Sequence, residues 1–294
     1  MDTYIELSES PLRPGISPVR LRYRTAGAGA PVVILHGGWG YEAYPFDRQI
    51  AALAPSHRLV IPDRSGYGAS GRLRVQALDF HQRAAAETFA VIDRLGLQRP
   101  VLWGHSDGGV IALLMGLAAP ERLSGLIVEA PHFFRRKPAS REFFETMRDH
   151  PDAFGGTIAG ALARDHGDAW RDVIAANGDV WLRLAELGGD LYDGRLSPLP
   201  VPVLVIHGVA DPRTEPGELD ALRAALTAPQ AVGTEFGAAE PGRSVAGKDV
   251  PAVRFEILAG GRHSPHSERA TADEVTRIAS EFVAGLAPAP VGRS

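Results

Sequence analysis

The chain has 294 residues and a formal net charge of −4, with 45% hydrophobic and 22% charged residues. A chain of this length and composition can bury a sizeable core without metal ions or disulfides. Its 31 basic residues do not outnumber its 35 acidic ones, so it lacks the positive field that a nucleic-acid partner requires. The absence of cysteine excludes disulfides, thiolate nucleophiles, iron–sulfur clusters and cysteine zinc sites.

The start of the chain and its longest apolar run bear on location. The first fifteen residues have neither the basic region nor the apolar region of a secretory signal. The longest apolar stretch, residues 110–119, is too short to cross a bilayer. We therefore expect a cytoplasmic protein with no membrane or nucleic-acid partner, and the sequence leaves its oligomeric state open.

Short runs of branched apolar residues predict strands. Segment 17–25 comes first and alternates apolar with polar residues, which is typical of a half-exposed antiparallel edge strand. The later runs are nearly continuous, as in parallel strands covered on both faces, and lie at residues 31–35, 58–61, 100–103, 123–128, 201–206 and 253–258. Helical patterns separate most of them, at residues 80–95, 110–117, 215–226 and 271–286. This alternation predicts an α/β fold with a mostly parallel, doubly wound sheet.

Two stretches interrupt the alternation. Residues 131–198 contain helical pieces but no convincing strand, and we expect them to form a small helical cap. This insert would divide the core into residues 1–130 and 199–294. Residues 229–251 are rich in Gly, Ala and Pro without any period, which predicts a long mobile loop within the core.

The strongest chemical signal is Gly104-His105-Ser106-Asp107-Gly108, a G-x-S-x-G between a predicted strand and a predicted helix. A serine on such a sharp turn has a strained backbone, so its neighbours two positions away must be small. The following helix begins where backbone N–H groups can stabilise a developing oxyanion. Ser106 is thus the candidate nucleophile, and the alternative is a helix-capping serine in a glycine-rich turn.

A serine nucleophile needs a base, and the base needs an acid that orients it. Asp211 follows the strand at 201–206, and His263 follows the strand at 253–258. Both therefore lie at the sheet edge where open α/β folds bind ligands. Glu129 is an alternative acid and His266 an alternative base.

Glycines after the first core strand predict an anion site. The segment Leu35-His-Gly-Gly-Trp-Gly40 lets the backbone approach an oxyanion closely. We expect N–H groups of Asp107 and Gly38 to form the oxyanion hole, with Trp39 as the alternative to Gly38. No G-x-G-x-x-G is present there, and His263 and His266 have no third ligand at a useful spacing, so we expect no cofactor and no metal.

The motifs together resemble the α/β-hydrolase fold superfamily over nearly the whole chain. HGGWG is similar to its oxyanion loop, PDRSGYGAS to the turn after its fourth strand, and GHSDGG to its nucleophile elbow. GVADP and GGRH are similar to its acid and histidine loops. The elbow and the short cap further resemble the valacyclovir hydrolase-like branch, which implies that Asp107 receives a substrate ammonium. The alternative for Asp107 is an acid that the helix dipole favours.

The predicted activity is that of a serine hydrolase that cleaves small carboxylic esters through an acyl-enzyme. A serine instead of an aspartate nucleophile disfavours the epoxide hydrolase and haloalkane dehalogenase reactions. The alternatives are hydrolysis of a carbon–carbon bond or lactone by the same triad, and a ligand-sensing protein with the hydrolase fold. The expected partner is a small-molecule ester, and the candidate substrate-binding residues are Trp39, Asp107, Phe133 and Phe134.

Overall fold

The computed structural model describes residues 3–228 and 253–286. Within them the chain forms an 8-stranded sheet of order β1-β2-β4-β3-β5-β6-β7-β8. The strands are β1 Thr3–Leu7, β2 Val19–Ala26, β3 Ala30–Leu35, β4 His57–Pro62, β5 Val101–His105, β6 Gly125–Glu129, β7 Val203–Gly208 and β8 Val253–Leu258. From β4 to β8 along the sheet every pairing is parallel, which confirms the predicted α/β class. The segment 229–251, for which we expect a mobile loop, lies outside the described residues.

The antiparallel strand predicted at the sheet edge is present as β2, but it is not the edge. Strand β1 pairs antiparallel with its outer side, and β2 pairs antiparallel with β4 on its inner side. The pairing of β1 buries Ile5 and Leu7 against Val19 and Leu21. The alternation in β2 agrees with its one covered face, as predicted. The predicted edge position is wrong, because β1, which is only five residues long and leaves little signal in the sequence, pairs outside it.

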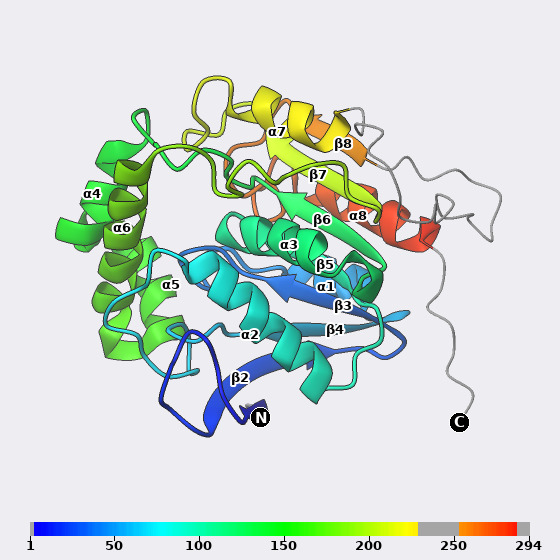
Figure 1. Cartoon of the computed structure of the whole chain (residues 1–294), viewed down its shortest axis with the longest axis horizontal. Coiled ribbons are helices and arrows are strands. Elements are labelled where there is room, and N and C mark those ends of the chain that lie inside the picture. The colour runs from blue at the N-terminus through cyan, green and yellow to red at the C-terminus, as the bar shows by residue number, and fades with distance from the viewer. Residues whose placement is uncertain (1–2, 229–252, 287–294) are drawn as a thin grey trace.

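Helices cover both faces of the sheet (Figure 1). They are α1 Asp47–Leu53, α2 Phe80–Arg94, α3 Asp107–Ala118, α4 Arg141–Asp149, α5 Gly156–His166, α6 Trp170–Leu187, α7 Glu218–Thr227 and α8 Ala272–Gly285, with 3₁₀ turns at Pro120–Arg122, Pro151–Phe154 and Gly167–Ala169. Helices α2, α3 and α7 share one hydrophobic cluster, whereas α1 and α8 share a second cluster behind the sheet. No helix among the described residues is long and apolar enough to cross a membrane.

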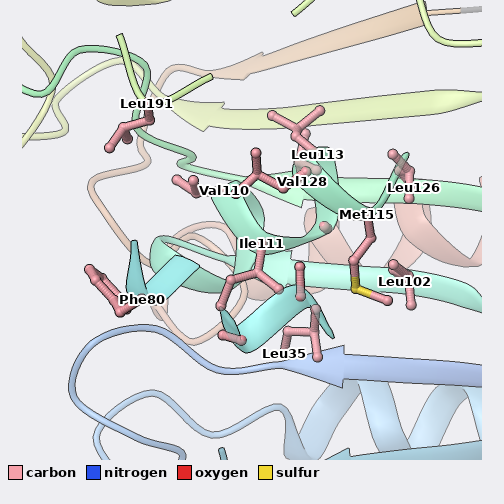
Figure 2. Packing of buried hydrophobic residues seen from close by; sticks show 14 of the residues in the cluster. Leu35, Phe80, Leu102, Val110, Ile111, Leu113, Met115, Leu126, Val128 and Leu191 are labelled. Atoms are coloured by element: carbon pink, nitrogen blue, oxygen red, sulfur yellow. The ribbon is translucent and has the colours of Figure 1, made fainter. Parts of the chain in front are cut away.

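Helix α3 is the centre of the larger core. It is apolar nearly all round, and its residues 107–116 are all buried. Figure 2 shows Ile111 and Met115 on this helix near Leu35 and Leu102 of the strands beneath it. Burial of a large apolar side chain contributes about 1.5–3 kcal/mol, so this packing fixes the position of the helix N-terminus. Ser106 immediately precedes that N-terminus.

Helices α4, α5 and α6 follow β6 and lie together at one end of the sheet (Figure 1). They pack through aromatic and aliphatic residues that belong to the same cluster as α3, among them Phe144, Leu162 and Trp181. They approach the end of the sheet where Ser106 meets the loops after β3, β7 and β8.

Candidate active site

Ser106 lies on a strained turn between β5 and α3. Its φ of 55° and ψ of −120° are uncommon for a residue with a side chain, and the surrounding packing must hold them. A Cβ on Gly104 would lie 2.0 Å from the Gly108 carbonyl oxygen, and one on Gly108 would lie 2.1 Å from the Leu35 oxygen. Both glycines of the G-x-S-x-G motif are therefore required sterically, as the sequence predicts.

The hydroxyl of Ser106 begins a chain of hydrogen bonds. The Ser106 Oγ lies 3.0 Å from His263 Nε2, and His263 Nδ1 lies 2.8 Å from Asp211 Oδ2. The three side chains come from the ends of β5, β8 and β7, and all are buried. Their chain order and contacts are those that a nucleophile, a base and an orienting acid require.

The surroundings of this chain shift its acid–base equilibria. Burial lowers the pKa of His263 below 6.5, and the positive charge of Arg213 lowers it further, while Asp211 opposes both. Burial alone would raise the pKa of Asp211, but the charge and hydrogen bond of His263 outweigh it and keep the value below its ordinary range. The imidazole is therefore neutral, and the carboxylate ionised, at neutral pH.

The alternative acid and the alternative base pair with each other. His266 Nδ1 lies 2.7 Å from Glu129 Oε1, and His266 Nε2 lies 3.0 Å from the Tyr44 carbonyl oxygen. The His266 ring also stacks on Phe46, with centroids 3.7 Å apart. Both ring nitrogens are thus occupied, so neither residue of this second pair reaches the Ser106 hydroxyl.

Two backbone segments offer free amides beside Ser106. Within residues 3–228 and 253–286, the N–H groups of Gly38, Trp39 and Asp107 donate no hydrogen bond to a protein acceptor. Asp107 is the first residue of α3, where the helix itself supplies no acceptor for its N–H. A Cβ on Gly37 would lie 3.1 Å from Ser106 Cβ, so the loop after β3 passes directly beside the serine.

The side chain of Asp107 is held by three neutral donors. Its Oδ1 accepts hydrogen bonds of 3.1 Å from His81 Nε2 and Trp181 Nε1, and its Oδ2 accepts one of 3.1 Å from Asn177 Nδ2. Burial works against the charge, but the interaction with His81, the positive charge of Arg64 and the hydrogen bond from Asn177 lower the pKa of Asp107 to about 2. The carboxylate thus links α3 to α2 and α6 beneath the site.

A small pocket opens over Ser106 and encloses about 330 Å³, counting its mouth. Of the predicted substrate-binding residues, Trp39 and Asp107 line it. Phe133 and Phe134 line a separate open groove instead, and their backbone N–H groups bind the carboxylate of Glu218. The aromatic wall of the pocket over Ser106 comes from Tyr44, Phe143, Phe144 and Trp181.

Three polar residues of this pocket escaped the sequence analysis. His132 stacks on His263 with ring centroids 5.6 Å apart, and burial holds its pKa well below 6.5. Asn177 comes from α6, and Arg213 comes from the loop that carries Asp211. The sequence signal for Arg213 was its position two residues after the predicted acid. His132 and Asn177 had no comparable signal.

The loop after β3 is also tied to the end of α5. Asp165 Oδ2 accepts hydrogen bonds from the N–H of Tyr41 over 2.7 Å and of Glu42 over 3.3 Å. His166 Nε2 donates to the Trp39 carbonyl oxygen over 3.1 Å, and its Nδ1 accepts the Gly68 N–H over 2.9 Å. The helical segment after β6 thus holds the loop that carries the free amides.

Metal binding has no support in the part of the chain that the structure describes. No group of three or more His, Cys, Asp or Glu side chains there is arranged to hold a metal ion. Near Ser106, the described carboxyl and imidazole groups include three hydrogen-bonded pairs: Asp211 with His263, Glu129 with His266, and Asp107 with His81.

Solved structures share the fold at low sequence identity. The chain aligns with a thermophilic esterase from Thermogutta terrifontis at 21% identity and a TM-score of 0.65. The alignment covers 96% of this chain and 98% of that one. A likeness at this identity bears on the fold alone.

Sequence relatives match over shorter segments. Epoxide hydrolase A of Mycobacterium tuberculosis is 39% identical over 37% of this chain and 34% of its own length. The pimeloyl-[acyl-carrier protein] methyl ester esterase of Pectobacterium carotovorum is 34% identical over 37% of this chain and 40% of its own. The chain thus aligns with well under half the length of either relative. The sequence profile of the family described as alpha/beta hydrolase fold matches residues 30–197, more than half of the chain. The chain belongs to the alpha/beta hydrolase fold family.

Proposed function

We propose that the protein is a serine hydrolase that cleaves small carboxylic esters through an acyl-enzyme. His263 accepts the proton of Ser106 while the Ser106 Oγ attacks the ester carbonyl carbon. The N–H groups of Asp107 and Gly38 receive the negative charge that develops on the carbonyl oxygen. The tetrahedral intermediate then expels the alcohol, which takes the proton from His263.

The second half of the reaction regenerates the serine. A water molecule attacks the acyl carbon and passes its proton to His263, and the Ser106 oxygen leaves with that proton as the carboxylic acid is released. Asp211 holds the His263 ring in the tautomer whose Nε2 is free to accept a proton. In this proposal, α4–α6 act as a cap that excludes bulk water from the pocket.

The observation that carries this proposal is the unbroken path from Ser106 to His263 to Asp211, with distances of 3.0 and 2.8 Å. The three free amides beside Ser106 add the anion stabilisation that acyl transfer needs. A serine at the elbow argues against the reaction named for the mycobacterial relative, and the small pocket argues for a short acyl or alcohol group.

The test is covalent labelling with a fluorophosphonate probe, followed by peptide mapping. We expect one labelled residue, Ser106, and no label on Ser106→Ala protein that keeps its circular dichroism spectrum. Short esters such as phenyl acetate and ethyl pentanoate should turn over in the wild type and not in this variant. Label on another residue, or a labelled Ser106 in protein that turns over no ester, would contradict the proposal.

A further inference from the structure

Arg213 places a positive charge in the wall of the pocket over Ser106. Its backbone N–H donates to Asp211 Oδ1 over 2.9 Å, so one short turn positions both the triad acid and this cation. The side chain is half-buried and lines the pocket together with Trp39, Tyr44 and Ser106. Any substrate that reaches Ser106 therefore passes close to a guanidinium group.

The guanidinium of Arg213 is held by aromatic rings. Its central carbon lies 4.1 Å from the Phe143 ring centroid, 5.1 Å from that of Trp39 and 6.0 Å from that of Tyr44. Its Nη2 also donates to the Tyr44 hydroxyl over 3.2 Å. These contacts orient the group through its face, so that its N–H edges stay available to a ligand.

No carboxylate neutralises Arg213 within residues 3–228 and 253–286, where no Asp or Glu oxygen lies within 4.0 Å of its side-chain nitrogens. Other arginines of the described residues lie over aromatic rings, with an acidic partner there (Arg24, Arg122 and Arg171) or without one (Arg20, Arg64 and Arg223). Among these arginines over rings, Arg213 alone lines the pocket over Ser106. Arg213 has five N–H donors and uses one of them on a neutral hydroxyl. A partly desolvated cation with spare donors favours an anionic ligand.

The one acidic side chain among the described residues that line this pocket is more buried than Arg213. Asp107 is only 1% exposed, and its oxygens already accept three hydrogen bonds from His81, Trp181 and Asn177. Of the two charged groups, the guanidinium is thus the more exposed, and the carboxylate is the one already compensated by hydrogen bonds. A substrate whose ester group reaches Ser106 would therefore find Arg213 available to an anionic group and Asp107 already occupied.

We propose that Arg213 is a specificity residue that selects esters carrying a free carboxylate, such as half-esters of short dicarboxylic acids. This inference rests on the proposed function, because it assigns the substrate class of the same site. A planar guanidinium pairs with a carboxylate through two parallel N–H···O bonds, which a neutral or cationic ester cannot form. The assignment is opposite in charge to the ammonium substrate that the resemblance implied.

The test compares three ethyl esters of matched length: monoethyl glutarate (anionic), ethyl pentanoate (neutral) and ethyl 4-aminobutanoate (cationic). We expect wild-type kcat/KM to be at least about tenfold higher for the anionic ester than for the neutral one. In Arg213→Met that ratio should fall on the order of ten- to a hundredfold, mainly through KM. Arg213→Lys keeps the charge but loses the planar guanidinium, so its anionic-to-neutral ratio of kcat/KM should lie between those of the wild type and Arg213→Met.

The matched control is Arg122→Met. Arg122 follows α3, away from Ser106; it also lies over an aromatic ring, but it pairs with Asp93 of α2. Its anionic-to-neutral ratio should equal that of the wild type. A wild-type ratio near one, an unchanged ratio in Arg213→Met, or a preference for the aminobutanoate ester would overturn the inference while leaving the ester hydrolase proposal intact.

A binding measurement keeps the inference testable without turnover. Glutarate should bind to Ser106→Ala protein in titration calorimetry, and Arg213→Met in that background should weaken binding at least about tenfold. Glutarate that fails to bind, or binds both proteins equally, contradicts the inference. Absence of both fluorophosphonate label and ester turnover contradicts the proposed function instead, and the calorimetric result still decides the role of Arg213.

Discussion

Two histidines three residues apart in the loop after β8, His263 and His266, each contact a carboxyl group through one ring nitrogen. They differ in the group that the other ring nitrogen contacts. His263 pairs with Asp211 and directs its other nitrogen to the Ser106 hydroxyl. His266 pairs with Glu129 and directs its other nitrogen to a backbone carbonyl oxygen. The bond lengths of 2.8 and 2.7 Å within the pairs are nearly equal. The contact of Nε2, rather than the pairing with a carboxyl group, therefore distinguishes the two histidines: His263 can accept the proton of a hydroxyl, and His266 faces a carbonyl oxygen that has none to give.

The sharpest way to break this comparison is to remove the imidazole that faces Ser106. In His263→Ala we expect kcat/KM for ethyl pentanoate to fall on the order of ten-thousandfold, because no other base among the described residues bonds to the Ser106 hydroxyl. The melting temperature should change by only a few degrees. A variant that keeps more than a tenth of the wild-type rate would show that proton transfer does not pass through His263.

Removing the other imidazole should chiefly change stability. His266→Ala leaves the fully buried Glu129 carboxyl without its imidazole partner, and removing one partner of a buried hydrogen bond costs about 1–3 kcal/mol. Urea unfolding followed by circular dichroism measures this loss. Glu129→Gln combined with His266→Ala replaces the unpaired carboxyl by a neutral amide and should recover part of this lost stability. If His266→Ala unfolds at the wild-type urea concentration, the pair has no structural role.

The catalytic pair is useful only if an anion can form beside Ser106. A Cβ on Gly38 would lie 2.4 Å from Asn177 Oδ1 and 2.9 Å from Asp107 Oδ2, so Gly38→Ala must shift the loop that offers its N–H. We expect kcat to fall about ten- to a hundredfold, with fluorophosphonate labelling slowed in parallel. Gly156→Ala serves as a control on the exposed start of α5, since a Cβ there meets nothing within 4 Å and the residue does not have a positive φ. Equal kcat in wild type and Gly38→Ala would remove Gly38 from the oxyanion hole.

The smallest expected effect concerns pH. Because burial and Arg213 lower the pKa of His263, kcat/KM for a neutral ester should reach half its maximum below pH 6.5 and be lost as the pH falls through that point. Arg213→Met removes one of the lowering influences, while Asp211 and His207 stay in place. The midpoint should therefore move upward by a fraction of a pH unit. A downward move would contradict the assigned direction.

Much of the fold was predictable because buried parallel strands leave continuous apolar runs. The helices predicted at 80–95 and 110–117 correspond to α2 and α3. Short elements were missed: β1 and α1 have five and seven residues, too few to establish a period. The edge position assigned to β2 failed for the same reason.

The candidate site was predictable where one strand end determines one residue. Ser106, Asp211 and His263 each follow a strand, and parallel strands bring those ends to one edge. The choice between His263 and His266 required distances, since both follow β8 closely. The pocket wall was the hardest part to predict from the sequence. Phe143 reaches it from α4 and Asn177 from α6, and the rotation of these helices about their own axes depends on tertiary packing.

The attachment of α5 to the loop after β3 has a practical consequence for engineering. Asp165 and His166 at the end of α5 hold the backbone from Trp39 to Glu42, so the geometry of the amide groups beside Ser106 depends on this helix. A chimera that exchanged this helix for that of another hydrolase, in order to transplant selectivity, would leave those amides without support. We expect such a chimera to keep this geometry only if the new segment has Asp and His at the positions of Asp165 and His166.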